Sequence, residues 1–576
     1  MTEWLVLIVA GTGFLFDTYE LLLLPLIAAP AVAEILQVPP NNPLVTDWVG
    51  RMLWLAALSG GVFGLAGGWL TDRLGRKTVL ALSIALYSLS PAAAALSTSL
   101  PWFLFFRCAT FVGVCIEFVA AITWLAELFP DHGRREKVLG WTQAFASLGG
   151  LCVTLANGWL LKHAAGLPGL PLHEPFNGHA DWRYTLLTGL LPAIPIAVLL
   201  PFVPESKVWR ERRLAGTLRR PSLGQLFSPE LRRTTLVTAA LSACAYGIAF
   251  GALQLTPTRI VPGLPDLAEQ QKTLRPLQAD AQQLNGQLIE LLPRFQQACV
   301  DVPGLLELSG RRAKTRLALR ANRNQLEAPE TSAERKAALG ESLNGLTNQL
   351  TTLDAELAQL TAVKPDAKKV LLDREKLFGQ LAANRELQAK PDRVVKARGT
   401  ELQFWQETGG LLGRIALAAL LALAIPRGTL LRLFQGPGVI ILPLTYYWLF
   451  REQPGWFQWG VGVVGFLTVA QFSYFGEYLP KVFPLHLRGT GGSFATNVGG
   501  RMLGTSAAFV TTNWVAPLCG GKAPAHVATA AAIVGTSMFV LGFLLSFLLP
   551  EPKPEAEPQP GARQPPQTPR QAHATG

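Results

Sequence analysis

The sequence predicts an all-α membrane protein: twelve transmembrane helices in two pseudo-symmetric six-helix bundles, with an inserted extracytoplasmic, coiled-coil-like helical domain. Of its 576 residues, 49% are hydrophobic and only 16% are charged, against about 25% charged in an average soluble domain. The apolar residues gather in blocks of about twenty, the length that a helix needs to cross a hydrocarbon core of about 30 Å. This composition excludes an ordinary soluble enzyme.

A window of about nineteen residues finds twelve apolar segments. They are 4–29, 49–71, 78–98, 102–126, 138–161, 183–203, 234–256, 409–426, 436–450, 457–479, 490–516 and 525–549. The first segment lacks a basic region and a small-residue cleavage site, and it contains Asp17 and Glu20. We therefore expect a retained helix there, not a signal peptide.

Lysine and arginine in the short loops predict the orientation, because cytoplasmic loops carry the excess of both. Most of them lie in the even-numbered connections and in the tail, whereas the loops of the other side hold few, such as Arg451 and Lys522. We expect both termini in the cytoplasm and the chain in the cell (inner) membrane. The net charge of +12 is then a topology signal with attraction to anionic lipid, and it gives no support to nucleic-acid binding.

A polar stretch at 259–406 separates the seventh and eighth spans. It contains two runs with leucine spacing of three and four, each of which resembles one seam of a coiled coil about three heptads long. These runs are Leu274, Leu277, Ala281, Leu284, Leu288, Leu291 and then Leu343, Leu346, Leu350, Leu353, Leu357, Leu360. Turn signals at 303–304 and 328–332 predict a hairpin or a small bundle outside the cytoplasm. This insert is also the expected surface for a protein partner or for self-association.

The predicted organisation has five parts. These are an N-terminal six-helix bundle (1–203), a basic cytoplasmic linker (204–233), a C-terminal bundle (234–258 and 407–549), the insert (259–406) and a tail (550–576). The tail is rich in proline and is expected to be disordered.

The loop after the second span reads GWLTDRLGRKTVL, from Gly68 to Leu80. It resembles the loop signature of the major facilitator superfamily, and it matches that signature at Gly68, Leu70, Asp72, Arg73, Gly75, Arg76 and Lys77. The resemblance implies two bundles that work by alternating access around a central site. It also implies a gating and structural role for these residues, with no direct contact to substrate.

Two further blocks extend the resemblance to the metabolite:proton symporter and sugar-porter branches. The first block contains Arg107, Gly113, Glu127, Pro130 and Arg134. The second half repeats its Glu-x-x-Pro and Pro-x-x-x-Arg spacings at Glu477, Pro480, Pro484 and Arg488, as duplicated halves would. The motif Pro204-Glu205-Ser206 follows span six, and Pro550-Glu551 follows span twelve. A lone Gln254 stands where sugar porters carry a glutamine pair, which argues against sugar specificity.

Ionisable groups at bilayer depth cost roughly 2.5–3.5 kcal/mol each, so each needs a partner or a function. Asp17 and Glu20 share one face of the first helix and, with Glu117, are the predicted proton-coupling residues. Two explanations stay open for Asp17 and Glu20: proton coupling, or structural pairing with Arg107 or Arg501. For Glu117 the two are a role in the transport pathway and a structural polar contact. Arg414 is expected closer to the outer surface than Arg501, where its guanidinium can extend toward water.

The predicted substrate-binding residues are Arg107, Arg501, Asn497 and Gln254. A guanidinium at mid-membrane offers two parallel donors to a carboxylate, so we expect an anionic substrate that enters with a proton. A uniporter or antiporter of sugars or metabolites is the alternative. A sensor or scaffold that uses the insert is another. We expect no enzyme activity, cofactor or metal, because the sequence has no nucleophile with a base, no metal-ligand cluster and no phosphate-binding glycine loop.

Overall fold

The computed structural model describes most of the chain. The described residues are 2–38, 40, 42–128, 132–172, 176–191, 193–199, 202, 205–215, 223–327, 332–421, 423, 425–484 and 487–551. The predicted tail therefore lies outside the described residues from position 552 onward. Parts of the linker and of the turn at 328–332 lie outside them as well.

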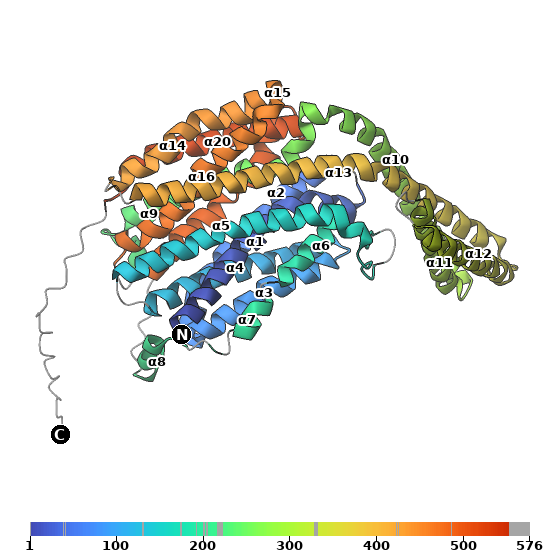
Figure 1. Ribbon diagram of the computed structural model, residues 1–576, viewed down its shortest axis with the longest axis horizontal. Helices are drawn as coiled ribbons and strands as arrows, with labels where there is room; N and C mark the ends of the chain where they lie inside the picture. The colour runs from blue at the N-terminus through green and yellow to red at the C-terminus, as the bar shows by residue number, and fades with distance from the viewer. Residues whose placement is uncertain are drawn as a thin grey trace, which may run out of the picture.

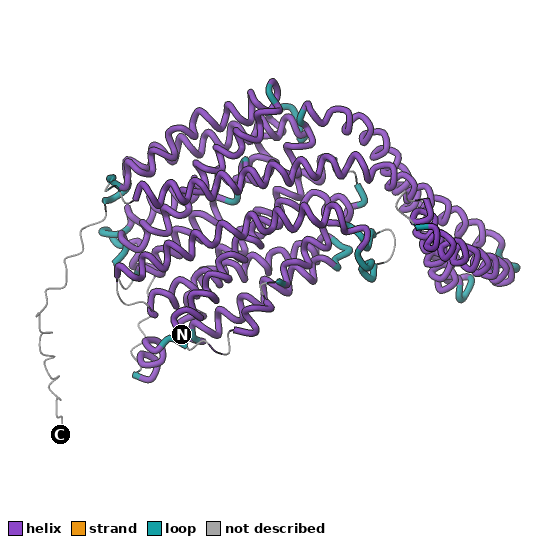
Figure 2. The backbone as a smooth tube through the Cα atoms, viewed as in Figure 1, coloured by secondary structure: helices purple, strands orange, loops and turns teal. Residues whose placement is uncertain are grey.

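The described residues form helices and no strands (Figure 2). The N-terminal half contains α1 (Thr2–Leu36), α2 (Pro43–Leu74), α3 (Arg76–Ala95), α4 (Leu100–Leu128), α5 (His132–His163), η1 (Ala164–Gly166), α6 (Asp181–Leu187), η2 (Thr188–Leu190) and α7 (Ala193–Leu199). The linker contains α8 (Lys207–Leu214) and η4 (Leu223–Phe227).

The C-terminal half begins with α9 (Arg232–Gly251). It continues through η5 (Leu253–Leu255), η6 (Thr256–Ile260), η7 (Val261–Gly263) and η8 (Pro265–Leu267). After the insert come α14 (Arg427–Pro443), η9 (Leu444–Leu449), α15 (Phe450–Glu452), α16 (Pro454–Val482), α17 (Arg488–Ser493), η10 (Phe494–Gly504), α18 (Ala507–Phe509), η11 (Val510–Val515), α19 (Ala516–Leu518), α20 (Pro524–Leu545) and η12 (Ser546–Leu548). In Figure 1 the blue helices of the first half lie below the orange helices of the second half.

Eight segments in the described part of the chain are long and apolar enough to cross a membrane. They are Gly11–Leu36, Pro43–Gly67, Arg76–Ala95, Leu100–Ala121, Arg232–Gly263, Arg427–Glu452, Pro454–Leu479 and Pro524–Ser546. The other four predicted spans coincide with α5, with α6 to α7, with the end of α13 and with the run from α17 to α19. Two π-helical stretches, η10 and η11, interrupt that last run. The number twelve thus stays a prediction.

The insert forms four helices that project from the bundle, and we call them the arm (Figure 1). They are α10 (Ala268–Asp301), α11 (Leu305–Glu327), α12 (Ala333–Leu360) and α13 (Pro365–Leu421). The first turn contains Gly304, whose positive φ of 88° suits glycine. After the second turn, the Ser332 side chain accepts a hydrogen bond from the Arg335 amide and caps α12.

The leucine seams of the arm pack on different partners: α10 lies against α13, and α12 lies against α11. Apolar side chains from all four helices meet in one small core, which includes Phe295, Leu308, Leu357 and Leu371. The arm is therefore a small bundle with a core of its own.

The helix α13 continues from the arm into the C-terminal half without a break at the predicted boundary of 406 and 407. Glycines explain how it fits there. Gly409 and Gly413 lie directly against the carbonyls of Gly462 and Phe466 in α16, where a Cβ would overlap the backbone. Such small residues allow two helices in a membrane to pack at close range. The close packing of α13 on α16 thereby fixes the arm to the second half.

A buried arginine organises the arm. The Arg312 side chain has no exposed surface, and its Nε and Nη2 donate to the two oxygens of Glu375 at 2.7 and 2.9 Å. It also pairs with Asp354. Hydrogen bonds from Arg312 to Glu375, opposed in part by burial, raise the pKa of the guanidinium above its ordinary value, so Arg312 stays charged.

We expect Arg312→Ala to loosen α11 and α12, because it leaves the nearly buried Glu375 carboxylate without its main partner. Breaking a buried ion pair costs about 3–5 kcal/mol. Hydrogen exchange of the detergent-solubilised protein should show faster exchange across both helices. Arg311→Ala is the matched control, because Arg311 and its partner Glu356 are about half exposed and contribute less than about 1 kcal/mol. Equal exchange in both variants would contradict the assigned role of Arg312.

Candidate functional site: a charged cavity between the two halves

An ion pair joins the two halves at the centre of the bundle. Arg501 Nη2 of η10 donates to Asp17 Oδ2 of α1 at 2.9 Å, and both residues are more than nine-tenths buried. Arg501 Nη1 also lies 3.3 Å from the Val114 carbonyl and 3.4 Å from Asn497 Oδ1. The guanidinium stands over the Phe118 ring at 4.8 Å from its centroid. Both terminal nitrogens of the guanidinium therefore have polar partners, and one aromatic ring packs against it.

The π-helical stretch η10 positions this arginine. Gly499 and Gly504 lie against the backbone of α9 at Ala239 and Ala243, where a Cβ would not fit. Wide π-helical turns are frequent at functional sites because they change the direction of a side chain within a helix. The glycines bring η10 close to α9, and Arg501 lies between them in sequence.

A second, looser pair lies nearby. Arg107 Nη1 is 4.0 Å from Glu20 Oε2, and Arg107 Nη2 is 3.4 Å from the backbone carbonyl of Glu20. Both carboxylate oxygens of Glu20 are buried without a hydrogen bond among the described residues. The two structural pairings that the sequence left open, Asp17 with Arg501 and Glu20 with Arg107, are thus both present.

Glu117 is fully buried on α4, and its two carboxylate oxygens have no hydrogen-bond partner in the described part of the chain. It lies beside Gly13 of α1, where a Cβ would collide with its carboxylate. The charges of Asp17 and Arg501 are near enough to act on it. An acidic group that lies unpaired in this position costs free energy unless it is protonated.

A cavity of about 100 Å³ lies between the halves. The predicted residues Asp17, Arg501 and Gln254 line it, whereas Glu20, Glu117, Arg107 and Asn497 are not among its lining residues. Much of the remaining wall is aromatic, from Phe14, Phe118, Tyr246, Phe250 and Phe472. The cavity thus combines ionic groups with flat apolar surfaces.

Sequence reasoning missed one member of this cavity and misplaced another. Glu407 lines it, although the sequence assigns Glu407 to the junction with the insert. The expectation for Arg414 is wrong: its side chain does not extend toward water at the outer surface, and it is 8% exposed in the wall of the same cavity. The available signal was the run of Gln403, Gln406 and Glu407 just before closely spaced glycines, which marks a polar face on a tightly packed helix.

The predicted gating motif at 68–77 is hydrogen-bonded to Glu205 of the Pro-Glu-Ser motif at 204–206. The backbone amides of Arg76 and Lys77 donate to the Glu205 carboxylate at 3.0 to 3.2 Å. Glu205 therefore caps the first turn of α3, where a negative charge is favourable. Gly75, the residue just before α3, has a positive φ of 98°. The Arg76 guanidinium donates to the Thr71 carbonyl, while Arg73 is exposed.

The second half repeats this arrangement. The Gly428 amide at the start of α14 lies 3.3 Å from Glu551 Oε1, in the motif that follows span twelve. Glu477 pairs with Arg427 at 3.0 Å and with Lys481. The side chains of the remaining predicted motif residues, Gly68, Asp72, Glu127, Arg134 and Arg488, lie outside what the structure describes.

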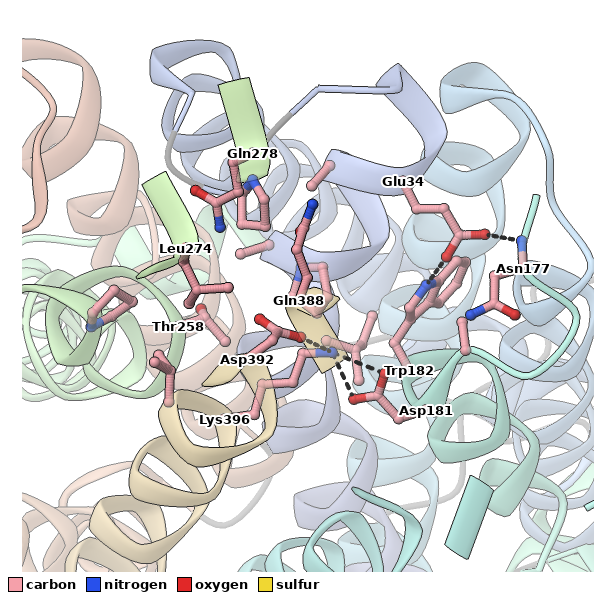
Figure 3. Close-up of a pocket in the computed structure, with 18 of the residues that line it drawn as sticks. Glu34, Asn177, Asp181, Trp182, Thr258, Leu274, Gln278, Gln388, Asp392 and Lys396 are labelled. Atoms are coloured by element: carbon pink, nitrogen blue, oxygen red, sulfur yellow. Dashed lines mark hydrogen bonds and ion pairs between the residues drawn. The ribbon is translucent and has the colours of Figure 1, made fainter. Parts of the chain in front are cut away.

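A second cavity, of about 270 Å³, lies at the base of the arm (Figure 3). It lies between α1, α5 and α6 of the first half and the arm helices α10 and α13. Glu34 borders it and accepts hydrogen bonds from the Trp182 indole at 2.8 Å, the Asn177 amide at 2.9 Å and Arg183 at 3.1 Å. This network fixes α6 to the end of α1.

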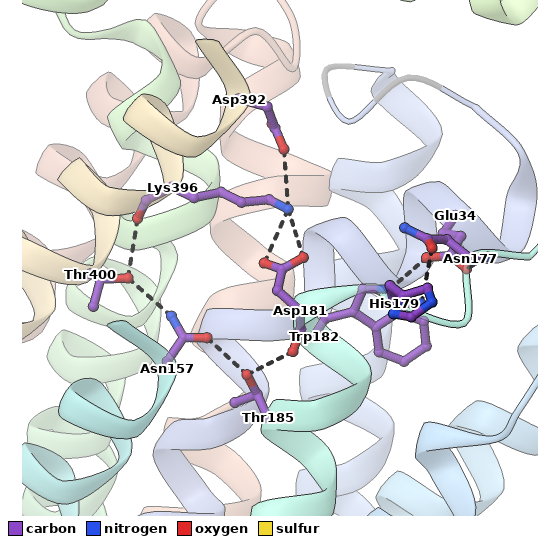
Figure 4. A network of polar contacts seen from close by, with 10 residues as sticks. All are labelled: Glu34, Asn157, Asn177, His179, Asp181, Trp182, Thr185, Asp392, Lys396 and Thr400. Atoms are coloured by element: carbon purple, nitrogen blue, oxygen red, sulfur yellow. Dashed lines mark hydrogen bonds and ion pairs between the residues drawn. The ribbon is translucent and has the colours of Figure 1, made fainter. Parts of the chain in front are cut away.

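A polar contact closes the arm side of the molecule (Figure 4). Lys396 Nζ of α13 lies 3.0 and 3.1 Å from the two oxygens of Asp181 in α6, and 3.1 Å from Asp392. Asn157 of α5 donates to Thr400 of α13 at 3.0 Å. Burial alone would lower the pKa of Lys396, but the two aspartates outweigh it and raise that pKa, so the ammonium stays charged.

Further contacts between the two halves lie on the arm side. Asp47 of α2 pairs with Lys522 and accepts from Asn513 at 2.7 Å. Arg259 of η6 donates to the Pro40 carbonyl at 2.7 Å. The two halves are therefore joined on the arm side by charged and polar contacts, each of which takes one partner from each half.

Comparison with known proteins agrees with this geometry. Residues 5–274 match the family model described as Major Facilitator Superfamily. The niacin transporter of Acinetobacter baylyi is 29% identical over 198 residues, which are 34% of this chain and 40% of that protein. The cis,cis-muconate transport protein of the same organism is 28% identical over 185 residues, which are 31% of this chain and 41% of that protein. The chain thus aligns with about two-fifths of the length of these relatives.

The likeness in fold extends further than the likeness in sequence. A solved D-xylose-proton symporter aligns with 96% of this chain and 99% of its own, with a TM-score of 0.52 and 14% identity. That alignment covers helices of both halves, whereas the family model ends at residue 274. The resemblance that the sequence motifs indicate is therefore confirmed: residues 5–274 match the major facilitator superfamily, and the likeness in fold to the solved symporter extends over both halves.

Proposed function

We propose that this chain is a secondary active transporter that carries a small organic anion, a carboxylate, together with a proton by alternating access. The observation that carries the proposal is the buried Arg501–Asp17 pair, which lies in a cavity and has one partner in each half. A pair in that place is broken or made whenever the halves rearrange around the cavity.

The chemistry of the pair supports coupling. A substrate carboxylate competes with Asp17 for the guanidinium, because both offer two oxygens to the same donors. A proton on a carboxylate of the cavity wall offsets the negative charge that the substrate adds and lowers the cost of holding it in a low-dielectric site. Substrate and proton thus stabilise the same rearranged state, which is what coupled transport requires.

The relatives support the choice of substrate class. Two of them are named for the transport of niacin and of cis,cis-muconate, compounds that carry carboxylate groups. The aromatic wall and the two arginines of the cavity suit such compounds better than a neutral sugar. An arabinose-proton symporter among the relatives keeps sugar transport as a competing hypothesis.

For the orientation, we propose that the arm lies outside the cytoplasm, as the lysine and arginine distribution predicts. The Lys396–Asp181 and Lys522–Asp47 contacts then close the outer side. The capped motif loops at Glu205 and Glu551 lie at the cytoplasmic side. Partners other than substrate, proton and lipid stay proposals for the arm surface.

A uniporter or antiporter is the second candidate, because each predicted coupling carboxylate of α1 has an arginine beside it. Such pairs can serve only to hold helices together. The two candidates differ in whether substrate entry moves protons.

We expect Asp17→Asn to weaken substrate-dependent proton movement strongly in proteoliposomes supplied with a panel of carboxylic acids. The amide oxygen can still accept a hydrogen bond from Arg501, but it cannot neutralise the guanidinium. Loss of the charge-assisted interaction costs about 1.5–3 kcal/mol, or roughly a tenfold to hundredfold loss of coupled uptake. Glu452→Gln, at an exposed position, is the control and should transport normally. Uptake that continues in Asp17→Asn without proton movement in either protein would favour a uniporter.

A further prediction concerns the closed arm side. Lys396→Met leaves Asp181 and Asp392 without their shared cation, so the arm side should open more often. Hydrogen exchange in α6 and in the middle of α13 should become faster. The pair of changes Lys396→Asp and Asp181→Lys should restore much of the protection, since a lysine again lies near two carboxylates. No change in exchange for Lys396→Met would exclude this contact as a closure.

A further inference from the structure

We infer that Glu407 of α13 is the carboxylate that takes up the proton when an anionic substrate enters the central cavity. The inference rests on the proposed transport function and adds a residue that neither the motifs nor the comparisons single out. It also places a proton-binding group on the helix that continues into the arm.

Glu407 lies in the wall of the central cavity and is nearly buried. Its side chain lines the cavity, and the residue is only 6% exposed. Its Oε1 accepts hydrogen bonds from Gln403 Nε2 at 2.7 Å and Gln406 Nε2 at 2.8 Å. Its Oε2 faces Gly150 of α5 in the opposite half, where a Cβ would overlap the carboxylate. The carboxylate therefore reaches across the boundary between the halves at a place that only glycine leaves open.

The charges that face this carboxylate are balanced. Arg414 lies seven residues further along α13, about 10 Å along the axis and on the same face of the helix. Arg501 and Asp17 line the same cavity. The Tyr246 hydroxyl is close enough to both arginines, Arg501 and Arg414, for an electrostatic interaction. Two guanidinium groups thus face two carboxylates, Asp17 and Glu407.

Charge balance gives a reason for one proton per monovalent anion. The four ionised groups sum to zero, so a bound anion leaves one net negative charge in a cavity of low dielectric. Such a charge is expensive unless it is neutralised. Protonation of one wall carboxylate restores neutrality, with the O–H bond formed on one side of the membrane and broken on the other.

The environments of the two carboxylates differ. Asp17 is in direct contact with a guanidinium at 2.9 Å, which stabilises its ionised form. Glu407 accepts hydrogen bonds from two neutral amides, which stabilise a negative charge less than a cation does. The proton is therefore expected on Glu407, while Asp17 stays ionised beside the guanidinium groups of the cavity.

The test compares Glu407→Gln with the parent protein in proteoliposomes, using the carboxylic acid that the parent transports. Glutamine imitates the protonated acid, so the variant should still exchange labelled substrate for unlabelled substrate across the membrane. It should lose proton movement and the uphill accumulation of substrate driven by a pH gradient. A residue with a purely structural role would lower exchange and coupled uptake together.

Two further variants sharpen the result. Glu401→Gln, at an exposed position six residues earlier on α13, is the matched control and should keep the proton-to-substrate ratio of the parent. Gly150→Ala leaves all charges in place but pushes on the Glu407 carboxylate, so it should slow exchange and leave that ratio unchanged. It provides a readout if Glu407→Gln folds poorly.

The outcomes separate the two proposals. A Glu407→Gln protein that keeps the proton-to-substrate ratio of the parent would overturn the role of Glu407 alone. A changed ratio in Gly150→Ala would also count against it, because that variant removes no titratable group. A parent protein that moves no proton with any acid in the panel would overturn both this inference and the proposed function.

Discussion

The burial of ionised side chains within the bundle is the constraint on which the rest of the structure depends. A charge in a medium of low dielectric is stable only beside an opposite charge or several strong hydrogen bonds. Arg501 meets that condition through Asp17, the Val114 carbonyl and the face of Phe118. Since Asp17 belongs to α1 and Arg501 to η10, satisfying the charge also aligns the two halves of the chain.

The same constraint explains the use of glycine in the second half. Gly499 and Gly504 let η10 approach α9, while Gly409 and Gly413 let α13 approach α16. Each close approach brings an ionised residue, Arg501 or Arg414, to the cavity wall. The glycines and the charges are thus parts of one arrangement, in which close helix packing leaves little room for water around the charged groups.

The continuous helix α13 connects this arrangement to the arm. It contains Lys396 at the arm side, Glu407 and Arg414 in the cavity wall, and the glycines that pack on α16. Because one continuous helix carries all of them, we expect a displacement of the second half relative to the first to act on the arm-side contact and on the cavity together. The arm is structurally part of the second half, although its own core is separate.

The sequence by itself determined the membrane class, the helical insert with its turns, the loop motif and most of the ionisable residues that enter the bundle. These depend on composition, on short periodic patterns and on fixed local spacing, all of which can be read along the chain. Only the tertiary structure decided which carboxylate lies beside which arginine, since Asp17 and Arg501 are 484 positions apart. The tertiary structure also shows that Arg414 and Glu407 line the cavity. The sequence could not show this, because whether a residue faces water depends on what packs against it. For both residues, that packing partner is a helix distant in sequence.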